Sequence, residues 1–319
     1  MSKPKLALYW AATCGGCDVA VLDTQTKVLD LADAFDIVLW PIAIDFKYSD
    51  IERLPEKSID VCLFNGAVRN AEQEHLANVL RKRSGLLVAF GSCACGGGIP
   101  GLANATDRQA IFARAYRETP STVNPDGVEP ATEIEMPEGV LTIPEFYDSV
   151  RCLDQVVNVD YYVPGCPPTV ELIGKVVDAL VSGELPPLGS VVAADKTVCD
   201  ECPREPKENR KVKAFRPLCE ATPNAEECFL DQGIVCCGPA TRAGCGATCP
   251  LANAPCRGCF GPPPATVDQG LKLLSAVSSV IDAKNEDEIE GIVDQIQDPL
   301  GLFYRFGLPR SLLHRKRKN

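Results

Sequence analysis

Short apolar runs alternate with longer amphipathic stretches through the first half of the chain. We predict strands for five apolar runs, at residues 6–10, 36–44, 61–64, 86–90 and 157–163. The amphipathic stretches between them predict helices at residues 19–34, 71–83 and 169–181. Strands that alternate with helices are typical of an α/β domain with a parallel sheet, and near-continuous apolar strands fit burial on both faces.

The pattern changes in three other segments. Residues 119–145 are rich in proline, threonine and acidic side chains, so we expect a surface insertion there. The proline-rich stretch 185–188 ends the first domain, and residues 199–264 combine little periodicity with dense cysteine, glycine and proline. An acidic helical pattern covers residues 266–297, and a basic tail follows at 315–318. We therefore expect a sheet domain at 1–188, a cysteine-rich domain with little regular structure at 189–265, and a helical C-terminal part at 266–319.

Composition and charge exclude some functions. The formal net charge is −11, whereas a surface that binds nucleic-acid phosphates needs the opposite sign. No apolar run approaches the roughly 20 residues that span a bilayer, and the first apolar stretch is too short for a secretory signal. We expect a cytoplasmic protein that does not cross a membrane and does not bind nucleic acid.

The cysteine content points to metal. The chain has 17 cysteines, and disulfides are rare in a reducing compartment. Its two histidines, His75 and His314, are isolated in the sequence, so any metal is held by thiolates. All-sulfur ligation suits iron–sulfur clusters or zinc. The cysteine-rich segment can hardly build a hydrophobic core alone, so bound metal would supply folding energy.

Four cysteines follow predicted strands of the first domain. They stand after the first, fourth and fifth strands, where open α/β sheets build their sites: Cys14, Cys17, Cys93 and Cys166. Four thiolates from three loops can hold a 4Fe–4S cluster, because each iron takes one terminal sulfur ligand. A thioredoxin-like pair would explain only the first two cysteines. Structural zinc would accept four thiolates, but zinc sites usually come as two close pairs.

Eight further cysteines in the second domain are enough for two more four-iron clusters. They begin and end with a C-x-x-C pair, and their positions are Cys199, Cys202, Cys228, Cys236, Cys245, Cys249, Cys256 and Cys259. A single C-x-x-C pair is also found in zinc ribbons, whereas eight cysteines after a first four-cysteine set favour iron–sulfur clusters.

Two runs in this segment resemble a known family. The stretch CCGPATRAGC at 236–245 and the stretch PCRGCFGP at 255–262 are similar to the C-terminal signature of nickel–iron hydrogenase small subunits. The C-x-G-C, Gly-Ser-Cys and Pro-Gly-Cys-Pro-Pro motifs of the first domain complete the resemblance. Within the family, the chain is most similar to the cytoplasmic methyl-viologen-reducing type, which in methanogens associates with heterodisulfide reductase. Such a small subunit has a flavodoxin-like first domain.

The resemblance implies a role for each cysteine set. The four of the first domain match the proximal cluster of the family, nearest the nickel–iron centre of the large subunit. Cys199, Cys202, Cys228 and Cys236 match the distal cluster, and Cys245, Cys256 and Cys259 match the medial one. Respiratory members carry a histidine where this chain has Cys199, and their medial cluster often has three irons. Here Cys249 can supply a fourth thiolate, so we expect three 4Fe–4S clusters.

The implied function is electron transfer. Electrons from hydrogen oxidation in a large subunit would pass through the clusters to a further subunit. We expect this further subunit to be a small flavin- or iron–sulfur-containing linker that passes the electrons to heterodisulfide reductase. Thiolate in place of imidazole adds negative charge and lowers the reduction potential. No catalytic group is evident, so we expect no independent activity. We interpret Asp18 as an ordinary first-turn helix residue rather than part of a proton path.

Three alternatives stay open at this point. The final acceptor could instead be a deazaflavin or sulfur. A complex-I-like subunit shares the first domain, but it has an adjacent cysteine pair at the proximal cluster and lacks the eight-cysteine domain. A zinc-stabilised scaffold would be colourless, whereas cluster protein is brown. Of the five other cysteines, Cys62 is expected in the core, Cys95 and Cys237 neighbour ligand positions, and Cys152 and Cys219 have no assigned role.

Overall fold

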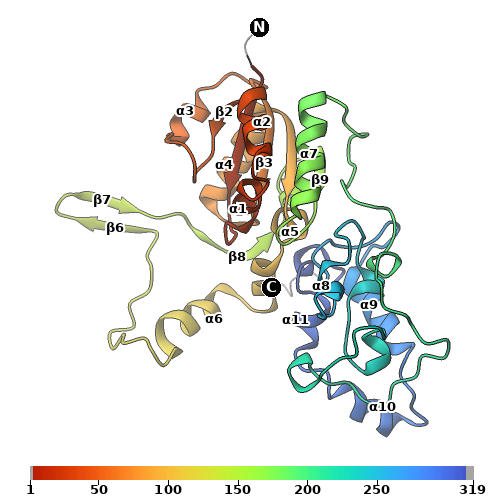
Figure 1. The fold of residues 1–319 in the computed structure, drawn as a ribbon. Helices are drawn as coiled ribbons and strands as arrows, with labels where there is room; N and C mark the ends of the chain where they lie inside the picture. Colours follow the sequence, from red (N-terminus) through yellow and green to blue (C-terminus); the bar gives the residue numbers. More distant parts are fainter. Residues whose placement is uncertain (1–2, 314–319) are drawn as a thin grey trace.

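A five-stranded parallel sheet forms the centre of the first domain in the computed structural model, which describes residues 3–313 (Figure 1). Its strands are β1 Lys5–Trp10, β2 Asp36–Leu39, β3 Ile59–Asn65, β5 Ser84–Phe90 and β9 Tyr161–Val163. They lie in the order β2-β1-β3-β5-β9, and all neighbouring pairs are parallel. This is the flavodoxin-like order, so the predicted fold class is confirmed. His314 and the predicted basic tail at 315–318 lie outside the described residues.

The two faces of the sheet carry separate hydrophobic clusters. Side chains of a strand alternate between faces, so Leu6 and Leu8 of β1 join one cluster while Ala7 and Tyr9 join the other. The first face is covered by α1 Gly16–Leu22, α2 Lys27–Ala34 and α7 Val170–Ser182. The second face is covered by α3 Tyr48–Glu52 and α4 Ala71–Arg83. The sheet domain is therefore stabilised by aliphatic and aromatic side chains on both sides.

Three predicted elements have wrong boundaries. The helix predicted at 19–34 is two helices, because Thr24 Oγ1 donates to the Val21 carbonyl and Gln25 adopts a left-handed φ of 56°. The strand predicted at 36–44 is shorter, because β2 ends at Leu39. The chain turns after Trp40, and Pro41 has no N–H to donate to a neighbouring strand. Of the strand predicted at 157–163, only the last three residues form a strand, β9. Just before it, the Asp160 side chain rather than its backbone bonds to β5, because its carboxylate accepts from the Leu87 N–H.

A surface arm lies where the insertion was predicted. It contains the antiparallel hairpin of β6 Glu133–Met136 and β7 Gly139–Thr142, which the sequence analysis did not predict. The hairpin projects from the sheet domain (Figure 1). Helix α6 Arg108–Ala113 and a π-helical turn, η2 Arg114–Glu118, precede it. After it, β8 Phe146–Arg151 returns and pairs antiparallel with β4 Val68–Asn70, so the arm is attached to the sheet domain at its base.

The cysteine-rich segment has little regular structure, as predicted. It contains short 3-10 turns and one four-residue helix, α8 Thr248–Leu251. Its side chains share a hydrophobic cluster with α9 Gln269–Ser278 and α10 Glu286–Val293, and this cluster includes Cys236, Cys237 and Cys256. No helix within residues 3–313 has the length and apolar character needed to span a bilayer.

The C-terminal segment returns to the sheet domain. It includes α11 Pro299–Phe303 and η8 Leu308–Arg310, and it packs beside α5 Ser92–Gly96 and η1 Ile99–Ala105. Arg310 donates to the Cys95 carbonyl at 2.7 Å, and the Gly98 N–H donates to the Phe306 carbonyl at 3.1 Å. The end of the chain thus contacts the loop that carries Cys93.

Candidate metal centres

The four cysteines of the first set meet at the carboxyl edge of the sheet. Cys14 follows β1, Cys17 lies in the first turn of α1, Cys93 lies in α5 after β5, and Cys166 follows β9. Cys17 and Cys93 are buried, whereas Cys14 and Cys166 are exposed. This is the edge where open α/β sheets bind their ligands, and the set has a buried and an open side.

The pKa values of these thiols show how closely they lie. Burial, followed by the neighbouring Cys93, Cys166 and Cys14, holds the pKa of Cys17 well above its usual range. Burial, with Cys166 and Cys14 nearby, raises the pKa of Cys93 to about 11. Burial also raises the pKa of Cys166. Three of the four thiols in this set therefore favour the neutral form, and a bound cation would favour their thiolates.

Two glycines leave room beside the thiols. Gly91 has a φ of 86°, and a Cβ there would lie 2.4 Å from Cys17 Sγ. In the second domain, a Cβ at Gly238 would lie 3.0 Å from Cys199 Sγ and 3.7 Å from Cys236 Sγ. A side chain at either position would occupy space next to the sulfur atoms, so both sites have the open cradle that a bulky inorganic group needs.

Four cysteines of the second domain line one small cavity, together with Phe229 and Leu230: Cys199, Cys202, Cys228 and Cys236. Burial, followed by Cys228 and Cys202, raises the pKa of Cys199 to about 12. Cys236 is buried, whereas Cys199 is exposed. This second set therefore also has one side that opens to the surface.

The remaining four predicted ligands form a third set. Burial, with Cys245 and Cys249 nearby, raises the pKa of Cys256 to about 11. Burial, followed by Cys256, raises the pKa of Cys259 to about 12. Cys249 thus lies near both Cys245 and Cys256.

Hydrogen bonds connect the three sets in a fixed order. Cys166 lies close enough to the Cys259 thiol to affect its pKa, and Ser92 Oγ donates to the Cys259 carbonyl at 2.5 Å. At the other side, the Cys256 N–H donates to Cys236 Sγ at 3.2 Å. The set with Cys256 and Cys259 therefore lies between the first-domain set and the set that lines the small cavity.

The donor atoms of all three sets suit iron–sulfur clusters. Within residues 3–313, no three His, Cys, Asp or Glu side chains are grouped so that they could hold one metal ion. In a 4Fe–4S cluster each thiolate binds a different iron, so its ligands are spread around a larger body. Four soft sulfur donors per set, with glycine cradles in two of them, fit such a group.

Comparison with known proteins places the chain in a family. Residues 14–180 match the family described as NADH ubiquinone oxidoreductase, 20 Kd subunit. Over 317 residues the chain is 43% identical to the iron–sulfur subunit of the F420-non-reducing hydrogenase of Archaeoglobus profundus, covering 98% of each chain. The chain belongs to the family of F420-non-reducing hydrogenase iron–sulfur subunits. The predicted resemblance to hydrogenase small subunits is confirmed, and the chain is a subunit of an oxidoreductase that acts on hydrogen.

Two further comparisons concern another relative and the fold. The corresponding subunit of the vhu F420-non-reducing hydrogenase of Methanocaldococcus jannaschii is 38% identical over 314 residues, covering 98% of each chain. A solved [NiFeSe] hydrogenase from Desulfovibrio vulgaris Hildenborough aligns with a TM-score of 0.50 and 16% identity, covering 89% of this chain and 99% of that chain. The structural match supports the fold of the hydrogenase subunit.

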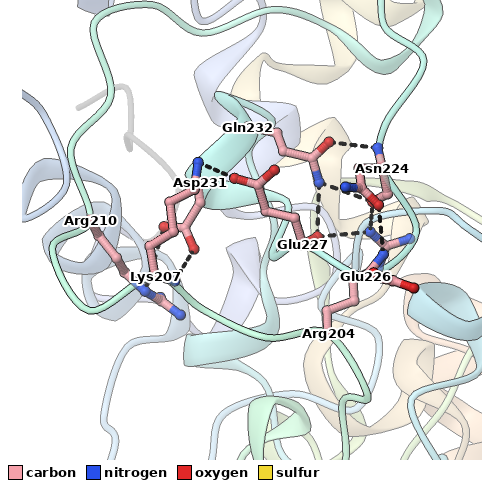
Figure 2. Close-up of polar contacts among 8 residues, drawn as sticks. All are labelled: Arg204, Lys207, Arg210, Asn224, Glu226, Glu227, Asp231 and Gln232. Carbon is pink, nitrogen blue, oxygen red and sulfur yellow. Dashed lines mark hydrogen bonds and ion pairs between the residues drawn. The ribbon is translucent and has the colours of Figure 1, made fainter.

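A polar network that the sequence analysis missed holds the loop between Cys202 and Cys228 in this hydrogenase subunit (Figure 2). Arg204 is 5% exposed, lies 3.8 Å from the centre of the Phe229 ring, and donates to the Asn224 and Glu227 carbonyls at 2.5 and 2.9 Å. Gln232 donates to the same two carbonyls. An arginine two residues after a C-x-x-C pair was visible in the sequence, but its partners are 20 or more residues away.

Asp18 is buried, which the sequence analysis did not predict. It lies in the first turn of α1, as predicted, and it is 1% exposed. Its carboxylate accepts from Trp40 Nε1 at 3.0 Å and from the Asn65 amide, and burial raises its pKa. The reason is that α1 packs on the sheet with this residue facing inward, beside the end of β3.

The five other cysteines lie in varied surroundings. Cys62 is fully buried in β3, as predicted for a core residue. The Cys95 thiol donates to the Ala89 carbonyl at 3.3 Å, and the Cys237 thiol donates to the Leu302 carbonyl at 3.8 Å. Cys152 Sγ lies 3.0 Å from Asp154 Oδ1, and Cys219 is exposed.

Proposed function

We propose that this hydrogenase subunit holds three 4Fe–4S clusters and transfers electrons between a nickel–iron large subunit and a further electron-transfer subunit. The observation that carries the proposal is the ordered arrangement of three four-cysteine sets. The proposed ligands are Cys14, Cys17, Cys93 and Cys166 for the proximal cluster; Cys245, Cys249, Cys256 and Cys259 for the medial cluster; and Cys199, Cys202, Cys228 and Cys236 for the distal cluster. In this proposal residues 1–188 and 189–265 are the two cluster-binding domains, and residues 266–319 are the C-terminal helical segment and basic tail.

The residues of the chain position and bury the three groups. When bound, 4Fe–4S clusters supply one-electron oxidation and reduction. Cys14 and Cys166 are exposed at one end of the arrangement, and Cys199 is exposed at the other. Two open ends suit two different protein partners. The middle set contacts the first domain through Cys259, which lies near Ser92 and Cys166, and its Cys256 is buried whereas its Cys249 is exposed.

The identity of the electron acceptor rests on the ligands and on the relatives. The names of the similar subunits describe hydrogenases that do not reduce F420, which is a deazaflavin. We therefore favour heterodisulfide reductase, reached through a small linker subunit, over a deazaflavin acceptor. A sulfur-reducing complex is the second candidate, because the chain is 28% identical over 259 residues to the sulfhydrogenase 2 subunit delta of Pyrococcus furiosus. All-cysteine ligation favours low reduction potentials, which suit either acceptor better than a quinone.

Iron and acid-labile sulfide per chain test the proposal. The complex is purified anaerobically, the subunits are separated, and both elements are measured on this chain. Three clusters predict about 12 of each. About four would restrict cluster binding to the first domain and favour a complex-I-like role, and zinc without sulfide would contradict electron transfer altogether. Nickel in the accompanying subunit would identify the large-subunit partner, and reduction of added heterodisulfide reductase or sulfur would separate the two acceptors.

A further inference from the structure

The hairpin at the tip of the surface arm, residues 119–145, has one apolar face. In its antiparallel register Ile134 pairs with Leu141 and Glu135 pairs with Val140, so paired residues share a face and successive residues alternate. Ile134, Met136 and Leu141 therefore share one face, and their exposed fractions are 52%, 45% and 57%. The opposite face carries Val140 and a polar set, Glu133, Glu135 and Thr142.

Within the described residues, the apolar face has no cover from the rest of the chain. Every residue of β6 and β7 is exposed, and the hairpin extends away from both domains (Figure 1). An isolated two-stranded hairpin is marginally stable in water, and an exposed apolar patch with a polar rim is typical of a protein interface. The arm therefore has the properties of a docking element.

The base of the arm is attached beside the first cysteine set. Val150 of β8 packs in a small cluster with Ala67 and Cys93. The Asn104 amide donates to the Val150 carbonyl at 2.9 Å, and the Val150 N–H donates to Asn104 Oδ1 at 2.7 Å. The base of the arm therefore lies beside the cysteine set whose Cys14 and Cys166 are exposed.

The charge of the arm indicates the chemistry of its partner. Residues 119–145 contain no lysine or arginine, and they contain six acidic residues: Asp126, Glu129, Glu133, Glu135, Glu138 and Glu145. A complementary surface has an apolar strip edged by lysine and arginine side chains.

We propose that the apolar face of the arm docks on the nickel–iron large subunit, on an apolar strip with a basic rim. The inference rests on the proposed function, because that function brings the large subunit to the open side of the first cysteine set. The arm adds a contact that extends the interface beyond the immediate surroundings of this set.

Two substitutions on neighbouring residues of β7 test this docking. Leu141→Glu places a charge on the apolar face, and Val140→Glu is the matched control, because Val140 is also 57% exposed but lies on the opposite face. Each variant is produced anaerobically with the large subunit of its own complex, and the dissociation constant of the two subunits is measured. We expect Leu141→Glu to weaken binding at least about tenfold, and Val140→Glu to change it less than about threefold. Iron content of each variant serves as the measure of an intact small subunit.

The outcomes distinguish a failure of the docking proposal from a failure of the proposed function. Weaker binding by Leu141→Glu alone supports docking through the apolar face. Equal binding by both variants, or equal weakening by both, would overturn it while leaving the proposed function in place. A self-association of the isolated wild-type chain that Leu141→Glu abolishes, with unchanged binding to the large subunit, would assign the face to a second copy. A wild-type chain without iron, or without affinity for the large subunit, would contradict the proposed function itself.

Discussion

The sheet domain and the cysteine-rich segment hold their cysteines by different means. In the sheet domain the thiols follow strands whose buried side chains are aliphatic and aromatic, for example Leu6, Phe64 and Leu87. In the cysteine-rich segment the thiols lie on irregular loops, and Cys236 and Cys256 are themselves part of the hydrophobic cluster. We therefore expect the first domain to position its site with a fold that is stable without metal, and the second to depend on bound metal for its fold.

Removal of iron would expose this difference most strongly. In the anaerobically prepared apoprotein, we expect amide exchange in residues 199–264 to accelerate by about a hundredfold or more relative to the loaded chain. Amides of β3 and β5 should keep most of their protection, because their hydrogen bonds lie between buried strands. Hydrogen exchange with mass spectrometry measures both regions in one sample. Equal loss of protection in both would show that the sheet domain also depends on metal.

Single ligand substitutions sharpen the same comparison. Cys228→Ser should remove about four irons per chain and accelerate exchange in the cysteine-rich segment. Cys93→Ser should also remove about four irons, but β3 should stay protected. Cys219→Ser is the control, because this exposed cysteine belongs to none of the three sets. Iron analysis and hydrogen exchange provide the readouts, and iron loss in the control would reopen the ligand assignment.

Substitution of Arg204, which lines the same small cavity as the four proposed distal ligands, has the next largest expected effect on stability. Arg204→Met removes buried hydrogen bonds and the contact with the Phe229 ring, and it should cost about 2–4 kcal/mol of stability in the cysteine-rich segment. Arg216→Met changes an exposed arginine of the same segment and should cost under about 0.5 kcal/mol. Denaturant unfolding of the loaded protein under anaerobic conditions compares the two. Similar costs for both would show that the network in Figure 2 contributes little.

The smallest effect concerns a surface contact of the sheet domain. Hydrogen bonds from Arg151 and Tyr147 lower the pKa of Glu74 from 4.5. Its contribution is present above pH 4.5 and decreases as the pH falls through the lowered pKa. Glu74→Gln should therefore reduce stability by about 0.5–1 kcal/mol near neutral pH, and the difference from wild type should shrink in acid. Because this contact lies outside the cysteine-rich segment, the same difference is expected in apoprotein; a difference that vanishes without iron would contradict it.

The sequence was informative where local pattern decides structure. Strands such as β3 and β5 were predictable because each is a short run of mainly apolar residues. Helix α4 was predictable because Leu76, Ala77 and Leu80 recur at helical spacing. The cysteine sets were predictable as groups, since thiols in a reducing compartment point to metal. The break between α1 and α2 was not, because it depends on the left-handed conformation of Gln25, a residue with no turn preference of its own.

Features that depend on long-range contacts escaped the sequence analysis. The burial of Asp18 follows from Trp40 and Asn65, which lie 22 and 47 residues away. The hairpin of the arm has short strands, and its apolar residues occur among prolines and acidic residues that indicate a loop. The order of the three cysteine sets depends on contacts such as that of Ser92 with Cys259, which no spacing rule predicts.

The contact of the C-terminal segment with the Cys93 loop has a consequence for biosynthesis. Arg310 reaches the Cys95 carbonyl across 215 residues of sequence, and Gln155 reaches the Pro309 carbonyl across 154. On the ribosome the sheet domain is complete long before these last residues emerge, and domains generally fold as they are made. The loop with Cys93 is therefore uncovered throughout most of translation and covered last. The order of translation thus leaves an interval in which this loop is open before residues 309 and 310 pack against it.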